Sequence, residues 1–282
     1  MKIIKNIRVW FYYLRRDFFR NRLLKKISKF ALTEKGQNIS NEADFLIKNG
    51  ITVFPYPFVN NYSKSSVELS KIDGYPVVNY KEKNLYFPNS YSDEKVINYS
   101  YNLFIEQDES SPHSYKSPIF NIDCNDVLID IGCAEANYSL EIVHLVKEVY
   151  LFEADRKWLD PLTRTFAPWK DKVKIYNKKF GNEEGWIYEE FQNRDLLIKI
   201  DVDGSEREVL KSLDNLLTVA KSIKVAICTY HKNLDAIEFN DFFISRGFRT
   251  QFGKGFMLFY YDKKIKEPYL RPGILFAYKV NG

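Results

Sequence analysis

The chain is poor in the residues that build metal centres and covalent frameworks. Among its 282 residues there are three cysteines and three histidines, scattered without metal-ligand or disulfide spacing: Cys124, Cys133, Cys228, His113, His144 and His231. This scarcity argues against a zinc site and a disulfide-stabilised fold, and it predicts a reducing, cytoplasmic compartment. A divalent ion bridged by Asp201, Asp203 and Glu206 remains an alternative, but no ligand spacing demands one, so we expect no metal.

Long apolar runs are also missing. No run approaches the roughly 20 residues of a membrane-spanning helix, and charged residues interrupt any signal-peptide core. Hydrophobic residues nevertheless make up 45% of the chain, which is enough to build a core. The sequence therefore predicts a globular protein.

Positive charge is concentrated at the N-terminus. Residues 1–30 contain ten basic residues and one acid, a net charge of +9, so the remaining chain carries −4. This distribution argues against a nucleic-acid-binding surface spread over the fold and favours an arm that meets an anionic partner. Apolar residues recur at helical spacing in this arm: Ile3, Ile7, Trp10, Phe11, Leu14 and Phe18. Either the arm lies on the anionic inner face of the cell membrane, or it packs on its own domain or on a second subunit of a homo-oligomer.

Glycine is sparse where a dinucleotide would need it. The stretch 126–143, DVLIDIGCAEANYSLEIV, predicts a strand, a tight turn and a helix, but one glycine, Gly132, replaces the Gly-Xaa-Gly-Xaa-Xaa-Gly fingerprint. A turn of this kind brings the amides of the following helix next to an anionic group. With Asp130 two residues before the glycine, the turn suits a cofactor that has a cationic end and hydroxyl groups. S-adenosylmethionine is such a cofactor.

A second acid lies in register with this turn. The apolar run 149–152 ends at Glu153, which follows Asp130 by 23 residues. An acid at the tip of the second strand, roughly 20 residues past the first turn, accepts hydrogen bonds from ribose hydroxyls; a solvated loop carboxylate is the alternative. The predicted cofactor pocket consists of Asp130, Gly132, Ala134, Glu135, Asn137, Glu153, Ala154, Phe180, Gly181 and Asp201.

Strands and helices alternate from residue 126 onward. Apolar runs predict strands at 127–131, 149–152, 173–176, 196–201 and 223–228, and a strand-rich tail at 248–251, 256–261 and 274–278. Alternation of this kind requires a mostly parallel sheet with helices on both faces and the ligand at the strand tips. The predicted fold is therefore α/β and Rossmann-like.

Three regions are predicted along the chain. They are a basic amphipathic helix at 1–30, a small mixed α+β module at 31–118 and the cofactor-binding domain at 119–282. The module ends in residues 106–115, which combine acids, hydroxyls and a histidine just upstream of the first core strand. Blocks like this are usually solvated loops, but this one enters the sheet beside the cofactor corner, where loops often carry function.

Residues 126–261 resemble a class I S-adenosylmethionine-dependent methyltransferase. The segment KIDVDGSE at 199–206, with Val209 and Leu210, is similar to the signature of the FkbM-type family, which has Glu where this chain has Asp203. The resemblance implies a seven-stranded, mostly parallel sheet and an O-methyltransferase that acts on sugars, glycans or natural-product intermediates. The block at 106–115 resembles a feature of a bacterial subgroup. Ala136 replaces a glycine usual in the family's first motif, so the cofactor contact there is expected to differ.

Candidate catalytic residues lie at the tips of the fourth and fifth strands. Methyl transfer needs an in-line approach of the acceptor oxygen to the sulfonium carbon, and a group that takes up the proton. We interpret Asp201 as facing the transferred methyl group and His231 as the proton acceptor. Lys199 is either a third catalytic residue or a structural partner of Asp201 or Glu206. Predicted acceptor contacts are Glu106, Asp108, His113, Tyr115, Asp203, Glu206 and Tyr230.

The predicted activity is an S-adenosylmethionine-dependent O-methylation. Its acceptor is expected to be a hydroxyl of a sugar or glycan intermediate, in the biosynthesis of a capsule, lipopolysaccharide or related surface polysaccharide. Two alternatives stay open. One is an inactive S-adenosylmethionine-binding scaffold held at a membrane complex by the basic arm. The other is a nucleotide-sugar oxidoreductase or epimerase, against which the single-glycine turn counts.

Overall fold

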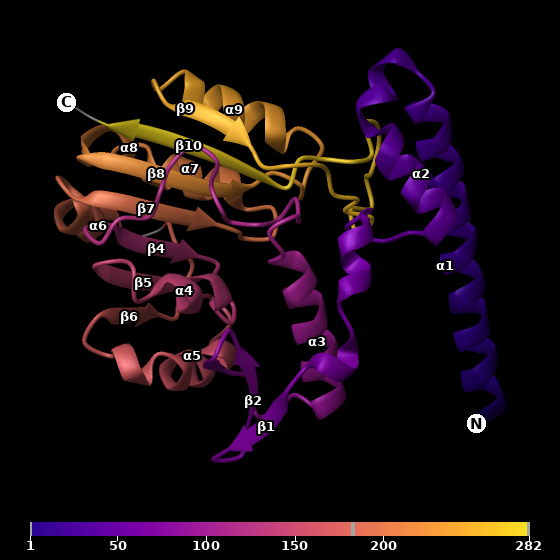
Figure 1. Cartoon of the computed structure of the whole chain (residues 1–282), viewed down its shortest axis with the longest axis horizontal. Coiled ribbons are helices and arrows are strands. Elements are labelled where there is room, and N and C mark those ends of the chain that lie inside the picture. Colours follow the sequence, from indigo (N-terminus) through magenta and orange to yellow (C-terminus); the bar gives the residue numbers. More distant parts are fainter. Residues whose placement is uncertain (1, 182–183, 281–282) are drawn as a thin grey trace.

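The computed structural model describes the backbone of residues 2–181 and 184–280, and the side chains of residues 17–181 and 187–280. Its centre is a seven-stranded sheet in the order β6-β5-β4-β7-β8-β10-β9 (Figure 1). The strands are β4 (Val127–Ile131), β5 (Glu148–Phe152), β6 (Val173–Tyr176), β7 (Asp195–Ile200), β8 (Ser222–Cys228), β9 (Arg249–Phe252) and β10 (Ile274–Val280).

The sheet is mostly parallel, as predicted. Strands β4 to β8 pair in parallel, whereas β10 pairs antiparallel with both β8 and β9. This confirms the predicted α/β, Rossmann-like fold with a seven-stranded, mostly parallel sheet. The strand predicted at 256–261 is wrong, because only Met257 forms a bridge there, with Arg271. The parallel strands end at one edge, where their tips can share a ligand.

Helices cover both faces of the sheet. Because side chains alternate along a strand, Leu128 and Leu197 pack into one apolar cluster, while Ile129 and Ile198 pack into the other. The first cluster includes residues of α4 and α5, and the second includes residues of α6 to α9. The helices are α4 (Asn137–Ile142), α5 (Leu159–Thr165), α6 (Glu184–Phe191), α7 (Glu206–Leu213), α8 (Leu216–Val219) and α9 (Asp235–Ile244).

The mixed module packs onto the first of these faces. It contains α2 (Ser40–Asn49), a three-stranded antiparallel sheet of β1 (Leu69–Ile72), β2 (Tyr75–Tyr80) and β3 (Lys83–Tyr86), and α3 (Asp93–Glu106). Apolar residues of its sheet and of α3, including Leu85 and Val96, belong to the same cluster as Leu128 of β4, whereas those of α2 pack with α1 (Lys2–Ala31). The module and the main sheet therefore share one core across the predicted boundary at 118. Short 3-10 helices are Glu34–Ile39, Pro57–Asn61, Lys64–Ser66, Arg156–Trp158 and Ala167–Trp169.

Helix α3 lies beside the carboxyl edge of the main sheet, with α1 and α2 beyond it (Figure 1). Ser92 begins α3 as an N-cap, because its side chain accepts a hydrogen bond of 3.2 Å from the Lys95 amide. Apolar residues of α3, such as Val96 and Leu103, are buried in the shared core. Its remaining surface is thereby held against the strand tips.

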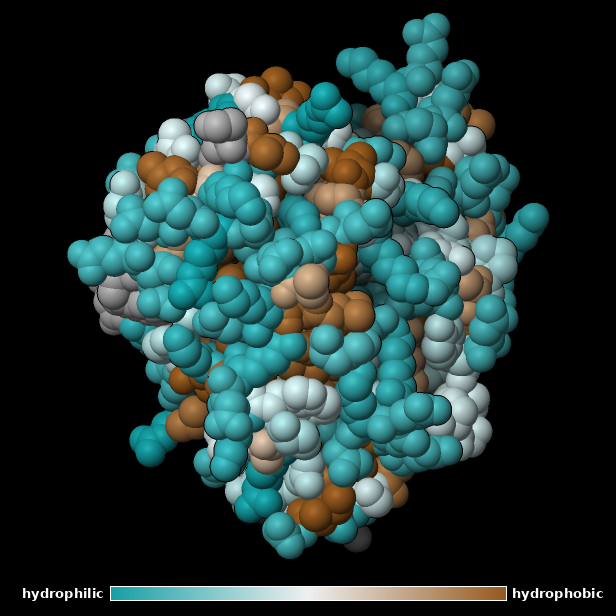
Figure 2. Space-filling view, turned by 60° about the vertical axis from the view of Figure 1, so that its left-hand side comes forward, coloured by the Kyte–Doolittle hydropathy of each residue, from teal (hydrophilic) through white to brown (hydrophobic). Residues whose placement is uncertain are grey.

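The predicted basic helix is α1 (Lys2–Ala31). Its C-terminal part packs on its own chain, as one alternative predicted, because Leu23, Ile27 and Phe30 are buried with residues of α2 and of the segment 258–270. Phe18 is 71% exposed, whereas the stripe residues Ile3, Ile7, Trp10, Phe11 and Leu14 lie outside the described side chains. Among the described residues, no helix combines the length and apolarity that crossing a bilayer requires. The face in Figure 2 is mainly hydrophilic, with apolar residues in small groups.

Candidate cofactor and acceptor site

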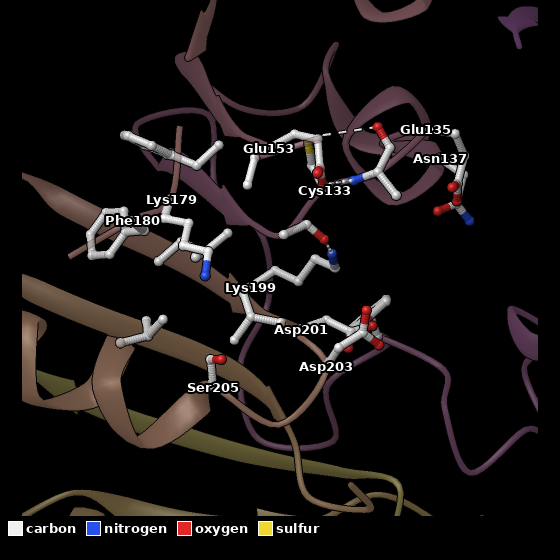
Figure 3. A pocket seen from close by; sticks show the side chains of 18 of the residues that line it. Cys133, Glu135, Asn137, Glu153, Lys179, Phe180, Lys199, Asp201, Asp203 and Ser205 are labelled. Carbon is white, nitrogen blue, oxygen red and sulfur yellow. Dashed lines mark hydrogen bonds between the residues drawn. The ribbon is translucent and has the colours of Figure 1, made fainter. Parts of the chain in front are cut away.

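A cavity of about 850 Å³ lies at the carboxyl edge of the sheet, between the strand tips and α3 (Figure 3). Its walls include most of the predicted site residues: Glu106, Tyr115, Gly132, Ala134, Glu135, Asn137, Glu153, Ala154, Phe180, Lys199, Asp201, Asp203 and Tyr230. The fold therefore gathers residues that are far apart in the sequence. Predicted site residues outside this wall are Asp108, His113, Asp130, Gly181, Glu206 and His231.

The turn after β4 requires glycine at its first position. Gly132 has a φ of +74°, and a Cβ there would lie 1.9 Å from the carbonyl oxygen of Asp201. The tips of β4 and β7 thus approach so closely that no larger residue fits. Ala134 and Ala136 have φ values of 45° and 58°, a left-handed conformation that is strained for alanine. The turn therefore keeps a left-handed backbone at Ala134 and Ala136, although alanine stands there in place of glycine.

A buried ion pair between Asp130 and Lys199 stabilises this turn. Asp130 is fully buried, and its Oδ1 lies 2.8 Å from Nζ of Lys199, which also donates a 3.0 Å hydrogen bond to the carbonyl of Gly132. Ser139 donates to the other carboxylate oxygen at 2.6 Å. Burial alone would lower the pKa of Lys199, but the charges of Asp130 and Asp201 raise it well above its ordinary value. Lys199 is therefore charged.

This geometry corrects two predictions. Asp130 does not reach the cavity wall, so it orders the cofactor turn and does not contact a ligand there. The closest partner of Lys199 is Asp130, not Asp201 or Glu206, because the parallel register places Lys199 directly opposite Asp130 on the neighbouring strand. Its ammonium group is thus engaged in supporting the turn.

Glu153 directly follows β5 and lies on the cavity wall, as predicted. Its Oε2 accepts a 3.0 Å hydrogen bond from the amide of Ala134, and its Oε1 accepts one of 2.6 Å from the amide of Asp155. A carboxylate offers about four acceptor positions, so two remain for hydroxyl groups. The backbone contacts therefore orient Glu153 without using up its capacity for a ligand.

An apolar part of the cavity lies near this acid. Phe180 contacts Phe152 edge-on, with ring centroids 5.0 Å apart, and the wall includes Ile131, Val202 and Val209. Such a surface accommodates a planar heterocycle. Gly181 lies outside this wall, and its carbonyl oxygen accepts a 3.2 Å hydrogen bond from the Ser212 hydroxyl, so its cofactor contact stays a prediction.

Helix α3 supplies wall residues that the sequence analysis missed. Tyr99, Asn102 and Gln107 line the cavity together with Glu106. Tyr99 donates a 2.6 Å hydrogen bond to Glu135, whose pKa is raised by burial to about 7. Tyr99, Asn102 and Glu106 are separated by three and four residues, which places them on one helix face. This polar stripe on a helix was the sequence feature from which the cavity-lining role of α3 could have been predicted.

Asp201 lies at the centre of a buried polar cluster. Its Oδ2 accepts a 3.1 Å hydrogen bond from the Tyr115 hydroxyl and lies 3.6 Å from Nε2 of His113, while its Oδ1 lies 3.8 Å from Nε2 of His231. Burial would raise the pKa of Asp201, but His113, Lys199 and His231 together lower it well below its ordinary value. Asp201 is therefore ionised.

His231 is backed by a buried carboxylate. Its Nδ1 lies 2.9 Å from Oε1 of Glu206, which is fully buried and accepts hydrogen bonds from the amides of Val202 and Gly204. Its Nε2 is directed towards Asp201 and the exposed Asp203, at 3.8 and 3.7 Å. Burial lowers the pKa of His231, but Glu206 and Asp201 outweigh this effect and raise it.

Three predicted acceptor contacts lie outside the cavity wall. Glu206 lies behind His231, and His113 is fully buried beside Asp201, so neither reaches the cavity. Asp108 accepts hydrogen bonds from Tyr62 and the Ser110 amide, at 2.6 and 2.7 Å, and stabilises a turn outside the wall. These polar residues were assigned from their place in the sequence, which does not report the direction of a side chain.

Neither a protein-family model nor a curated protein sequence matches this chain. Several solved structures are similar in fold. One is methyltransferase FkbM from Methylobacillus flagellatus KT, with 17% identity, a TM-score of 0.46, and coverage of 65% of this chain and 52% of that chain. This chain thus spans about half the length of that structure.

Two smaller structures are also similar. An rRNA methylase from Streptococcus thermophilus has 13% identity and a TM-score of 0.41, over 57% of this chain and 90% of that chain. A candidate methyltransferase from Streptococcus mutans, in complex with SAH, has 15% identity and a TM-score of 0.40, over 57% of this chain and 91% of that chain.

Proposed function

We propose that this protein is an S-adenosylmethionine-dependent methyltransferase. The observation that carries the proposal is the pairing of the Gly132 turn with Glu153 at the tips of neighbouring strands, on one wall of the same cavity. In this arrangement, Glu153 has free acceptor positions for ribose hydroxyls, and the apolar wall around Phe180 suits adenine. Asp201 and Glu135, further along the wall, suit the cationic methionine end.

The cofactor assignment predicts selective binding. S-adenosylhomocysteine should bind the full chain and NAD should not, and Glu153→Ala should weaken binding by about 1 to 3 kcal/mol because ribose hydroxyls lose their acceptor. Isothermal titration calorimetry measures all three, with Glu189→Ala on the exposed surface of α6 as the matched control. Tight NAD binding would point to an oxidoreductase or epimerase, and equal affinities of the two variants would remove Glu153 from the pocket.

For the acceptor, we propose a hydroxyl of an uncharged sugar or surface-glycan intermediate. The cavity wall beside α3 offers the amides of Asn102 and Gln107 and the carboxylates of Glu106 and Asp203, groups that hydrogen-bond to hydroxyls. In this part of the wall, Glu106 and Asp203 disfavour a phosphate or a nucleic-acid backbone because like charges repel at short distance, whereas Lys178 and Lys179 directly precede Phe180 in the part assigned to the cofactor. This composition favours a neutral polyol over RNA.

A transfer assay tests this acceptor class. The protein is incubated with methyl-labelled S-adenosylmethionine and, separately, with neutral glycan fractions, acidic glycan fractions and total RNA. We expect label in the neutral glycans and a methyl ether in the hydrolysed product. Label in RNA would overturn the acceptor assignment, whereas S-adenosylhomocysteine binding without transfer to any fraction would favour the inactive scaffold.

We further propose that α1 meets an anionic membrane face. Support comes from the net charge of +9 in residues 1–30 and from the exposure of Phe18 and Phe19. Each basic residue near such a surface contributes about 1 kcal/mol at low salt. The full chain should therefore float with vesicles containing phosphatidylserine, and added salt should release it.

The control for flotation is a chain that lacks residues 1–16. This truncation keeps Leu23, Ile27 and Phe30, which pack in the core beside α2. It should float less than the full chain, because it loses five of the ten basic residues in 1–30 but keeps Phe18 and Phe19, and the full chain should not float with pure phosphatidylcholine vesicles. Equal flotation of the full and truncated chains would remove α1 as the membrane contact.

A further inference from the structure

His113 occupies a fully buried position between the mixed module and the main sheet. Its Nδ1 lies 3.1 Å from Oε1 of Glu106, at the end of α3, and its Nε2 lies 3.6 Å from Oδ2 of Asp201, at the tip of β7. Nε2 also lies 3.2 Å from the Tyr230 hydroxyl and 3.5 Å from Sγ of Cys228. Each ring nitrogen therefore faces one carboxylate.

This arrangement repeats on the other side of Asp201. His231 also has a carboxylate at each ring nitrogen, with Glu206 at 2.9 Å from Nδ1 and Asp201 at 3.8 Å from Nε2. The result is a row of alternating charges, Glu106, His113, Asp201, His231 and Glu206. The two histidines approach different oxygens of the same aspartate.

We infer that His113, held by Glu106, is a positioning residue that fixes Asp201 and thereby sets the proton affinity of His231. This inference rests on the proposed methyl transfer, in which His231 takes up the acceptor proton. The carboxylates at 3.1 and 3.6 Å favour the charged form of His113, and in that form it holds Oδ2 of Asp201 and partly offsets its negative charge. Asp201 consequently attracts the proton on His231 less strongly, so the proton affinity of His231 is lower than it would be without His113.

A purely structural role accounts poorly for this cluster. Burying charged groups costs several kcal/mol per ion, and well-packed apolar residues of similar volume usually stabilise a core at least as well. Here an imidazole and two carboxylates from the module and the sheet converge on one wall of the cavity, at Glu106 and Asp201. The module therefore contributes to the reaction centre. Its segment 106–115 supplies Glu106 and His113 to the charged cluster around Asp201 and does not only connect the module to the sheet.

Charged and titratable groups around the two histidines come from several elements. His113 is faced by Glu106 from α3, by Tyr115 from its own segment, by Lys199 and Asp201 from β7 and its tip, and by Cys228 and Tyr230 from β8 and its tip. His231 is faced by Asp201, Asp203 and Glu206, and by the ring of Tyr230, whose centroid lies 4.2 Å from its own. Burial lowers the pKa of His113, but Glu106 and Asp201 raise it by more, so the pKa lies above its ordinary value.

Imidazole NMR on the full chain bound to S-adenosylhomocysteine tests this inference without an acceptor. The chain has three histidines, so three ring signals are assigned by single variants. In His113→Gln, which keeps a donor near Asp201 but removes the charge, the pKa of His231 should rise by roughly 1. The exposed His144→Gln serves as the matched control and should leave the His231 titration unchanged.

Glu106→Gln provides a second variant with little change of volume, should His113→Gln fold poorly. It should lower the pKa of His113, because the carboxylate that favours the charged ring is gone. An unchanged His231 titration in His113→Gln, or an unchanged His113 titration in Glu106→Gln, overturns the inference. Calorimetry with S-adenosylhomocysteine on the wild-type chain distinguishes failure of this inference from failure of the cofactor assignment. If the cofactor assignment is wrong, the wild-type chain does not bind S-adenosylhomocysteine.

Discussion

Replacing Lys199 by methionine should destabilise the folded chain by about 3 to 5 kcal/mol, because it leaves the charge of Asp130 buried without a partner. Asp130 is fully buried, and Lys199 is 2.8 Å away. The same ammonium group holds the Gly132 carbonyl, so the cofactor turn should loosen as well. Urea unfolding followed by circular dichroism measures the loss of stability.

The matched control is Lys221→Met. Lys221 also pairs with an aspartate, Asp195, at 3.0 Å, but its side chain is 65% exposed. Exposed ion pairs contribute about 0 to 1 kcal/mol, so this variant should lose little. The double variant Asp130→Asn with Lys199→Met should recover part of the loss, since no charge is then stranded. A loss in Lys199→Met no larger than in Lys221→Met would contradict the buried-pair account.

His231→Gln should reduce methyl transfer by about 100- to 10,000-fold, the usual contribution of a positioned general base. Its Nε2 lies 3.8 Å from Asp201 and 3.7 Å from Asp203, two residues of the cavity wall, and Glu206 lies 2.9 Å from the opposite nitrogen. Asp201→Ala should lose turnover for the same reason, since the base then loses its partner. His231→Gln should bind S-adenosylhomocysteine as the wild type does, whereas Asp201→Ala should still bind it but more weakly, because Asp201 also lies at the proposed methionine end. Single-turnover transfer from labelled S-adenosylmethionine to neutral glycans provides the rate.

The pH dependence of the wild-type rate follows from the same residue. A base accepts a proton only in its neutral form, and the pKa of His231 is raised above its ordinary value because Glu206 and Asp201 outweigh burial. Turnover should therefore be low below this raised pKa, rise as the pH passes through it and level off above it. EDTA should leave the rate intact.

Two results would move the chemistry away from His231. One is full activity in both variants, and the other is a rate that falls as the pH rises through the pKa of His231. The exposed His144→Gln should keep the wild-type rate and profile. Loss of activity on chelation, restored by added divalent ion, would replace the metal-free proposal with a metal-assisted one.

Local patterns in the sequence determined the main sheet and the cofactor corner. The alternation of apolar runs with helical spacing required a mostly parallel sheet, and that sheet was confirmed. The place of Gly132 and Glu153 at the ends of two apolar runs put both at the same edge, because parallel strands end together. These conclusions depend on short-range periodicity, which a single sequence contains in full.

Side-chain partners depend on strand order and on packing between distant segments, so only the tertiary structure decided them. Lys199 pairs with Asp130 because β4 lies directly beside β7, a neighbour relation that skips two strands in the sequence. His113 faces Asp201, and Glu206 faces His231. Both are buried, and a buried charge is costly unless an opposite charge lies next to it. Helix α3 forms a cavity wall because its apolar face is buried in the core that it shares with the sheet.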